Sequence, residues 1–296
     1  MTDWIDPELV PGLANTLTAH LPDGFLDVAT VRAIDDQLRV EAAPAVPPRV
    51  VTLEGGLELR VHGSLHGDAC LLWIHGGGMF LGSARTEDAY CADLAARLGV
   101  PVVAVDYRLA PEHPHPTPLH DCRAALHWCA DRFERVVVAG GSAGGGLAAA
   151  LCLLTRDEGG PPIAAAHLYY PMLDDRRDLP GGSALTDPPV WNRRLADLAW
   201  AAYLGGRPAD ALAAPARATD LRGLPPTYLD VGDLDLFRDE DAGYAARLAD
   251  AGVPVRFELV PGAVHAFELI APDAAISRVT RERRLLALAH DLNGAA

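Results

Sequence analysis

A serine between glycines is the clearest candidate for chemistry in this chain. Ser142 stands in the motif G-G-S-A-G at 140–144, after the apolar run 135–139 and before a helix-prone stretch over 147–154. Glycines suit a sharp turn between a strand and a helix, because a Cβ there would clash with the neighbouring element. Such a turn exposes the hydroxyl and places the next N–H at a helix N-terminus. The motif predicts a nucleophilic serine, and an ordinary glycine-rich turn is the alternative.

A serine hydroxyl needs a base within hydrogen-bond reach, and the base needs a carboxylate to orient it. His265 follows the expected strand 255–260 and a Pro-Gly turn, which predicts a loop at the end of a late strand. Asp235 and Asp233 both follow the run 227–231. Position favours Asp235 as the acid, with Asp233 as a competitor, and a solvated loop histidine is the alternative for His265.

A second glycine cluster can supply hydrogen-bond donors to an oxyanion. His75-Gly76-Gly77-Gly78 follows the apolar run 70–74, which predicts a loop facing the serine turn. Consecutive glycines let backbone N–H groups turn toward one point without side-chain obstruction. A phosphate-binding loop is the alternative, but the chain has neither G-K-[ST] nor a dinucleotide fingerprint.

These loops would be positioned by alternating strands and helices. Apolar runs rich in Val and Leu recur from residue 70 onward, separated by helical patterns. Continuous apolar runs indicate strands buried on both faces, so we predict an α/β fold with a mostly parallel central sheet flanked by helices. The runs 49–53 and 57–62, with two glycines between them, predict an antiparallel hairpin at the sheet edge.

Two segments interrupt this alternation and divide the chain. Residues 1–45 carry helical signals with several prolines, and residues 171–215 are rich in Pro and Gly before a helix-like stretch. We expect both to form a helical cap, with an irregular surface insertion as the alternative. The core would then comprise residues 46–170 and residues 216–296.

Composition narrows the function. The chain has 296 residues and a net charge of −15, which argues against nucleic acid and anionic membrane surfaces as partners. No run approaches the roughly 18 to 20 apolar residues of a membrane span. The acidic N-terminal residues lack an apolar segment, so we expect no secretory signal there. The five cysteines form no C-x-x-C pair, so we expect buried thiols, a cytoplasmic location and no metal.

Five motifs together resemble the hormone-sensitive-lipase-like (family IV) esterases of the α/β-hydrolase fold, over about residues 70–290. The first three are H-G-G-G at 75–78, Y-R-L-A-P-E-H at 107–113 and G-G-S-A-G-G at 140–145. D-L-F-R-D-E at 235–240 and H-A-F at 265–267 follow. The resemblance implies that Asp235 is the acid, and that Gly77, Gly78 and Ala143 supply the oxyanion N–H groups. It also implies a cap over the site, and no metal or organic cofactor.

Three positions depart from the family pattern. Gly141 stands where the family usually has Asp or Glu, which removes a side chain that braces the turn. Leu236 replaces a proline and Ala266 replaces a glycine. None of the three removes a catalytic atom.

The expected activity is hydrolysis of short to medium acyl esters through an acyl-enzyme on Ser142. Amide or lactone hydrolysis by the same triad is an alternative, and a non-catalytic ligand-binding relative is another. We expect a small-molecule ester as partner and leave a homodimer open. Four residues are candidates for the substrate pocket, with the core as their alternative place: Met79, Phe80, Trp191 and Tyr203.

Overall fold

The computed structural model describes residues 4–38, 43–176 and 187–294. One eight-stranded sheet runs through the molecule, in the order β1-β2-β4-β3-β5-β6-β7-β8. The strands are β1 Arg49–Thr52, β2 Glu58–His62, β3 Ala69–Ile74, β4 Val102–Asp106, β5 Arg135–Gly141, β6 Ala165–Tyr169, β7 Thr227–Gly232 and β8 Val255–Val260. From β4 to β8 all neighbours pair in parallel. The predicted α/β fold with a mostly parallel sheet is confirmed.

The predicted hairpin forms the antiparallel edge of this sheet. In β1, Arg49 pairs with Val61 of β2, and β2 then pairs antiparallel with β4. Gly55, in the connection between the two strands, has a φ of 81°, a conformation that suits glycine. The central strands β3 and β5 are buried along nearly their whole length, as their unbroken apolar runs predict.

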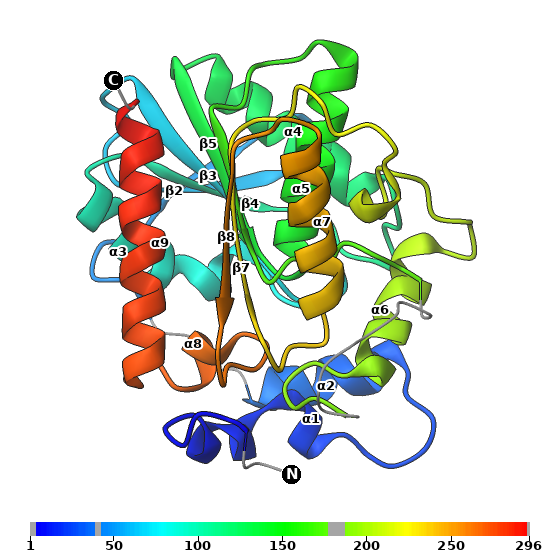
Figure 1. Ribbon diagram of the computed structural model, residues 1–296. Coiled ribbons are helices and arrows are strands. Elements are labelled where there is room, and N and C mark those ends of the chain that lie inside the picture. Colours follow the sequence, from blue (N-terminus) through cyan, green and yellow to red (C-terminus); the bar gives the residue numbers. More distant parts are fainter. Residues whose placement is uncertain (1–3, 39–42, 177–186, 295–296) are drawn as a thin grey trace.

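Helices cover both faces of the sheet. They are α1 Leu17–His20, α2 Val28–Leu38, α3 Asp88–Leu98, α4 Thr117–Ala130, α5 Ala143–Glu158, α6 Arg193–Leu204, α7 Arg238–Asp250, α8 Phe267–Ile270 and α9 Ala275–Asn293. Short 3-10 turns are η1 Val10–Asn15, η2 Glu54–Gly56, η3 Ala84–Glu87 and η4 Pro215–Arg217. Figure 1 shows α3 and α9 on one face and α4, α5 and α7 on the other.

Two hydrophobic clusters hold these layers together. The larger one joins α4, α5 and α6 to one face of the sheet, and the smaller one joins α3 and α9 to the other. Small side chains let α5 lie close to the strands, and nearly all of its residues are buried. Fully buried core leucines such as Leu72 and Leu151 each contribute roughly 1.5–3 kcal/mol of stability. All five cysteines are buried free thiols, as expected.

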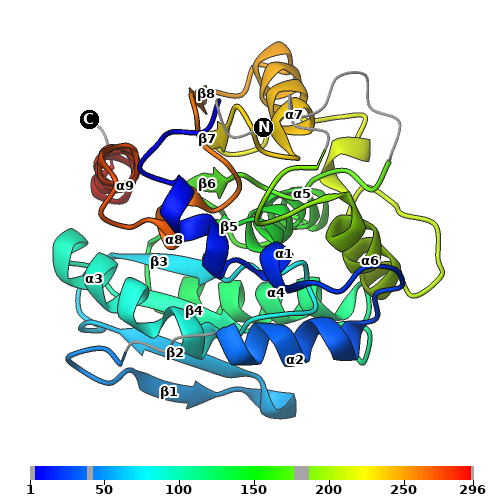
Figure 2. The ribbon, with the colours of Figure 1, turned by 90° about the horizontal axis from the view of Figure 1, so that it is seen from below.

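The N-terminal helices and α6 lie at the end of the sheet where α8 lies (Figures 1 and 2). Arg32 of α2 fixes this segment to the core. Its guanidinium donates to the carbonyl oxygens of Phe80 and Ala110 at 3.0 and 2.8 Å and forks onto Glu112. Arg32 thereby lowers the pKa of the Glu112 carboxyl to about 2. The motif at 107–113 thus anchors α2.

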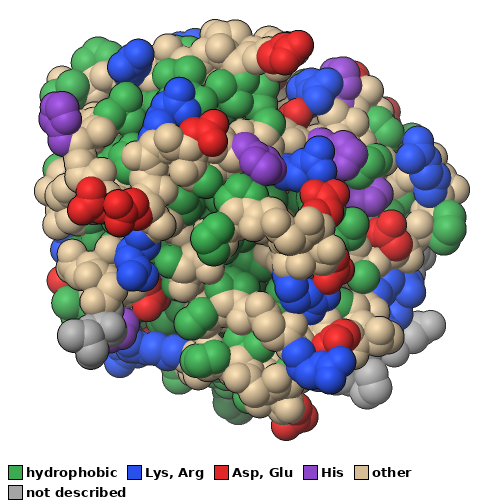
Figure 3. Space-filling model, turned by 90° about the horizontal axis from the view of Figure 1, so that it is seen from above, with side chains coloured by type: hydrophobic (Ala, Val, Ile, Leu, Met, Phe, Trp, Pro, Cys, Tyr) green, Lys and Arg blue, Asp and Glu red, His purple; other side chains and the backbone are tan. Residues whose placement is uncertain are grey.

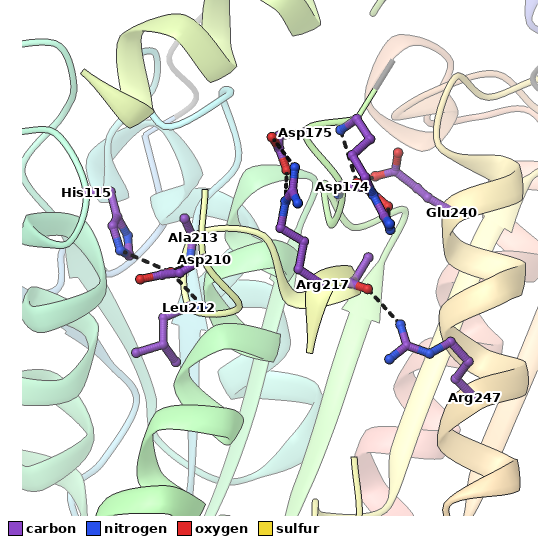
Figure 4. Close-up of polar contacts among 11 residues, drawn as sticks. His115, Asp174, Asp175, Asp210, Leu212, Ala213, Arg217, Glu240 and Arg247 are labelled. Atoms are coloured by element: carbon purple, nitrogen blue, oxygen red, sulfur yellow. Dashed lines mark hydrogen bonds and ion pairs between the residues drawn. The ribbon is translucent and has the colours of Figure 1, made fainter. Parts of the chain in front are cut away.

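Polar contacts tie the two ends of the predicted 171–215 insertion to the core (Figure 4). Arg217 forks onto Asp175 at 2.5 and 2.9 Å. Arg247 of α7 donates at 2.7 Å to the main-chain carbonyl of Ala216, the residue directly after the insertion. Glu240, also on α7, accepts the N–H of Leu173 at 2.8 Å. Residues 177–186 of the insertion lie outside the described residues.

On the end of the molecule seen in Figure 3, acidic and basic side chains are interspersed rather than gathered by sign. Of the helices within residues 4–38, 43–176 and 187–294, none is long and apolar enough to cross a bilayer.

Candidate active site

Ser142 lies at the apex of a strained turn between β5 and α5. Its φ of 55° and ψ of −120° are unusual for a residue with a side chain. The flanking glycines are required by space: a Cβ on Gly140 would lie 2.5 Å from the Gly144 carbonyl carbon, and one on Gly144 would lie 2.0 Å from the Ile74 oxygen. The turn therefore has the geometry that the motif predicts, and it holds the hydroxyl clear of the sheet.

The structure brings the three residues of the predicted triad into contact. His265 Nε2 lies 2.9 Å from Ser142 Oγ, and His265 Nδ1 lies 2.8 Å from Asp235 Oδ2. All three side chains are buried. The second carboxylate oxygen, Asp235 Oδ1, accepts the Phe237 N–H at 2.9 Å, which fixes the orientation of the carboxylate. This arrangement can move a proton from the hydroxyl to the imidazole.

The other aspartates of this region lie elsewhere. Asp233, the competing acid, accepts the Gly262 N–H at 2.7 Å and so joins two loops. Asp230 forms an ion pair with Arg284 inside the fold. Asp239 lies in the first turn of α7, and Phe237 holds the N-cap position of that helix. The contact with the imidazole thus belongs to Asp235.

Aromatic rings enclose His265. Tyr170 meets it edge to face with ring centroids 4.9 Å apart, and Phe237 does the same at 5.2 Å. The Trp191 indole lies 6.1 Å away, tilted by 36°. These rings restrict the imidazole to an orientation in which both nitrogens keep their partners.

The glycine loop lies beside the serine turn. Gly77 and Gly78 have φ values of 109° and 60°, and a Cβ on Gly77 would lie 2.3 Å from the Leu81 oxygen. Within the described part of the chain, the N–H groups of Gly77, Gly78 and Ala143 donate to no backbone acceptor. Ala143 is the first residue of α5, where the helix leaves its N–H unpaired. These N–H groups can hold an oxyanion.

Tyr107 supports the glycine loop from behind. Its ring stacks on His75 at 4.0 Å, and its hydroxyl donates to the His75 carbonyl oxygen at 2.9 Å. The Ala110 N–H donates to the Met79 oxygen at 2.9 Å. The motif at 107–113 therefore braces this loop as well as α2.

A cavity of about 450 Å³ opens onto Ser142 and His265. Its walls come from the glycine loop, the serine turn, Trp191, residues 265–266 and 268–270, and the N-terminal residues Asn15, Thr16 and Leu17. The four residues predicted to line the substrate pocket do not all lie at this cavity. Trp191 lines the cavity, whereas the other three do not and are buried in the hydrophobic core: Met79, Phe80 and Tyr203. A residue next to a catalytic loop points inward or outward according to packing, which the sequence does not fix, so those three candidates are withdrawn.

Two of the departures from the family pattern have structural consequences. Ala266, in place of glycine, has a left-handed φ of 50°, which stores strain directly after His265. Gly141 lies against the Tyr170 ring, and a Cβ there would be 3.3 Å from a ring carbon. The space beside the turn is thus filled by an aromatic ring.

Sequence reasoning missed Tyr170 and Glu268, which line the cavity and are hydrogen-bonded to each other. They lie 98 positions apart in the chain, so no local motif joins them. The position of Glu268, three residues after His265, is the one signal that could have singled it out. Across residues 4–38, 43–176 and 187–294, no three His, Cys, Asp or Glu side chains are grouped to hold a metal ion.

Comparison with known proteins matches residues 71–269 to the family described as the alpha/beta hydrolase fold. The esterase LipI of Mycobacterium tuberculosis is 37% identical over 235 residues, which are 76% of this chain and 73% of LipI. Carboxylesterase NlhH of the same organism is 38% identical over 221 residues, 69% of each protein. Among solved structures, a bacterial heroin esterase is 36% identical, with a TM-score of 0.84 over 98% of both chains.

The family match covers well over half of the chain, and it includes the glycine loop, the serine turn and the loop of His265. The relatives share more than 30% of their residues with it. The chain therefore belongs to the α/β-hydrolase family, within its branch of hormone-sensitive-lipase-like esterases.

Proposed function

We propose that this α/β hydrolase is a serine carboxylic-ester hydrolase. The observation that carries the proposal is the unbroken contact from Asp235 through His265 to Ser142, at 2.8 and 2.9 Å. The relatives named as esterases support the same reaction. Fold and triad do not by themselves set the leaving group, so ester preference rests on the relatives and on the assay below.

In the proposed acylation step, Ser142 Oγ attacks the ester carbonyl while His265 Nε2 takes its proton. Asp235 holds the imidazole so that Nδ1–H points toward the carboxylate, and it stabilises the imidazolium that forms. His265 then passes the proton to the oxygen of the leaving alcohol, which departs as the acyl-enzyme forms. Water, deprotonated by the same imidazole, attacks the acyl carbonyl and releases the acid and the free serine.

The negative oxygen of each tetrahedral intermediate is held by N–H groups of Gly77, Gly78 and Ala143. Donors of this kind, fixed in place before the reaction, typically contribute 10²–10³-fold to kcat each. The left-handed conformations of both glycines support this role, because they turn the amides away from the local chain.

Residues 1–45 and 171–215 form the proposed cap over the core segments 46–170 and 216–296. The contribution of Asn15, Leu17 and Trp191 to the cavity wall supports it. Trp191 is the substrate-contacting residue we retain from the four candidates. The cytoplasmic location and a homodimer remain predictions.

The cavity volume of about 450 Å³ supports short to medium acyl chains. An acyl-length series of nitrophenyl esters tests this, with the highest kcat/KM expected at short to medium length. Aryl formamides and lactones, assayed in parallel, separate the amide and lactone alternatives. Turnover of formamides or lactones well above that of every ester would contradict the proposed substrate class, and the Ser142→Ala variant controls for background hydrolysis.

A further inference from the structure

Four buried polar side chains form a connected cluster behind His265, and the proposed reaction uses none of them. Tyr170 Oη donates to Glu268 Oε1, and Arg284 Nη1 donates to the same oxygen at 2.6 Å. Arg284 also forks onto both oxygens of Asp230 at 2.7 Å. Tyr170 follows β6, Glu268 belongs to α8, Arg284 to α9 and Asp230 to β7. The cluster therefore joins four elements that surround the triad.

The cluster reaches the imidazole through Tyr170. The Tyr170 and His265 rings meet at 4.9 Å with an interplanar angle of 65°. The Tyr170 backbone has a positive φ of 38°. Its N–H donates to the main-chain carbonyl oxygen of Asp230 at 2.6 Å. Glu268 lies three residues after His265. The hydrogen bond from Tyr170 to Glu268 thus ties the histidine loop to the ring against which the histidine packs.

The same phenol occupies the space beside Gly141. A Cβ on Gly141 would lie 3.3 Å from Tyr170 Cε2 and 3.4 Å from its hydroxyl oxygen. An Asp or Glu at position 141, the residue types usual in the family, would carry its carboxylate toward that hydroxyl. Here the hydroxyl is bonded instead to Glu268, which approaches from the loop of His265.

Glu268 is present as a carboxylate. Burial raises its pKa, but the Arg284 guanidinium and the Tyr170 hydrogen bond outweigh burial and hold the pKa below its usual value. Other groups facing it are Asp230, the Tyr90 phenol of α3 and Arg281, whose guanidinium donates to the Glu268 carbonyl oxygen at 2.6 Å. Within the described residues, Glu268 Oε2 has no hydrogen-bond partner. A buried acceptor left unpaired costs about 1–3 kcal/mol, which the ion pair of Oε1 with Arg284 offsets.

We infer that Glu268 is a positioning residue for His265, acting through Tyr170, and that it supplies from the histidine loop the carboxylate missing at Gly141. The inference rests on the proposed ester hydrolysis. Glu268 keeps the Tyr170 edge against the imidazole.

Two variants test this role against a matched control. Glu268→Gln removes the charge but keeps a similar shape, and Tyr170→Phe keeps the ring but removes the hydroxyl. The control, Glu282→Gln, removes a half-exposed carboxylate of α9 that pairs with Arg97 at 2.5 Å, on the protein surface. Active enzyme is counted by fluorophosphonate titration, and nitrophenyl ester turnover is measured across pH.

Both variants are expected to lower kcat on the order of tenfold, the effect of weakening one hydrogen bond to a charged group, with KM unchanged. The dependence of kcat/KM on pH should differ between Glu268→Gln and Glu282→Gln, because only the first substitution alters the contact that orients the imidazole. The double variant Gly141→Asp/Glu268→Gln should recover kcat, since a carboxylate again reaches the Tyr170 hydroxyl. A merely structural role would not produce this recovery.

Two results would overturn the inference. The first is that Glu268→Gln and Tyr170→Phe both have the same kcat and the same pH profile as Glu282→Gln. The second is that each variant loses kcat in proportion to the fall in its melting temperature, and that adding Gly141→Asp to Glu268→Gln does not restore kcat. A wild-type chain that hydrolyses no ester would instead remove the proposed function, and this inference with it.

Discussion

The indole of Trp191 lies directly against Gly78: a Cβ on Gly78 would come within 2.6 Å of the Trp191 ring. A cap residue and a candidate oxyanion donor are therefore packed as one unit. Gly78→Ala should displace the indole and disturb the N–H group together. We expect kcat toward nitrophenyl esters to fall roughly 10²-fold or more.

The control for this prediction is Trp191→Ala, which removes the indole and leaves Gly78 in place. It should change acyl-chain preference more than kcat, because it enlarges the cavity and adds no side chain to the Gly78 backbone. Equal acyl-length profiles and equal kcat in the wild type and Gly78→Ala would contradict the packing argument.

Asp235→Asn is expected to leave the fold intact and to lower kcat roughly 10⁴-fold, because an amide favours the wrong imidazole tautomer. The measurement is steady-state turnover together with a melting curve. Asp233→Asn is the matched control, since Asp233 only joins two loops through the Gly262 N–H. A larger loss of kcat in Asp233→Asn than in Asp235→Asn would reverse the assignment of the acid.

Gly141→Asp should change stability or the pH optimum without abolishing activity. Gly141 does not have a positive φ, so its backbone conformation allows a residue with a side chain. The new Cβ would lie 3.3 Å from the Tyr170 ring, which requires a small shift of that ring. Turnover, pH profile and melting temperature are compared with the wild type. Complete loss of turnover in a folded variant would disprove this prediction.

Buried His167 should make stability depend on pH. Burial lowers its pKa below the ordinary 6.5, although Asp291 at 2.8 Å and Asp230 oppose this and Arg256 assists it. The native state thus favours the neutral imidazole, and its contribution is fully present above about pH 6.5. As pH falls below that value the contribution is lost, by at most about 1.4 kcal/mol per pH unit.

The measurement is urea unfolding of the wild type and of His167→Gln between pH 5.5 and pH 7.5. The variant removes one titrating group and leaves the other buried acids and histidines in place. The free-energy gap between the two proteins should shrink as the pH falls. A gap that is constant or grows toward low pH would show that His167 is not held neutral.

Much of the site could be predicted because its parts are local in the sequence. Ser142, Asp235 and His265 each follow a strand of the parallel part of the sheet, and parallel strands bring their carboxyl ends to one edge. The glycines at 140 and 144 lie on either side of Ser142, and a Cβ on either one would clash with backbone atoms of the turn or of β3. Such steric requirements are visible in the sequence as a short glycine motif around the serine.

The remainder depends on contacts between distant segments. Met79 and Tyr203 have the chemistry of a pocket wall, yet tertiary packing turns both into the core. The bond between Tyr170 and Glu268 has no local signature, because it depends on where β6 and α8 meet.

The central claim is that His265 activates Ser142 as a nucleophile, and covalent labelling tests it most directly. A fluorophosphonate should modify the wild-type chain once, at Ser142, as located by peptide mass mapping, and should abolish ester turnover. Ser142→Ala and His265→Ala should resist labelling and lose roughly 10⁴-fold or more in kcat. An adduct at another residue, or a Ser142→Ala variant that turns over esters at the wild-type rate, would contradict the account.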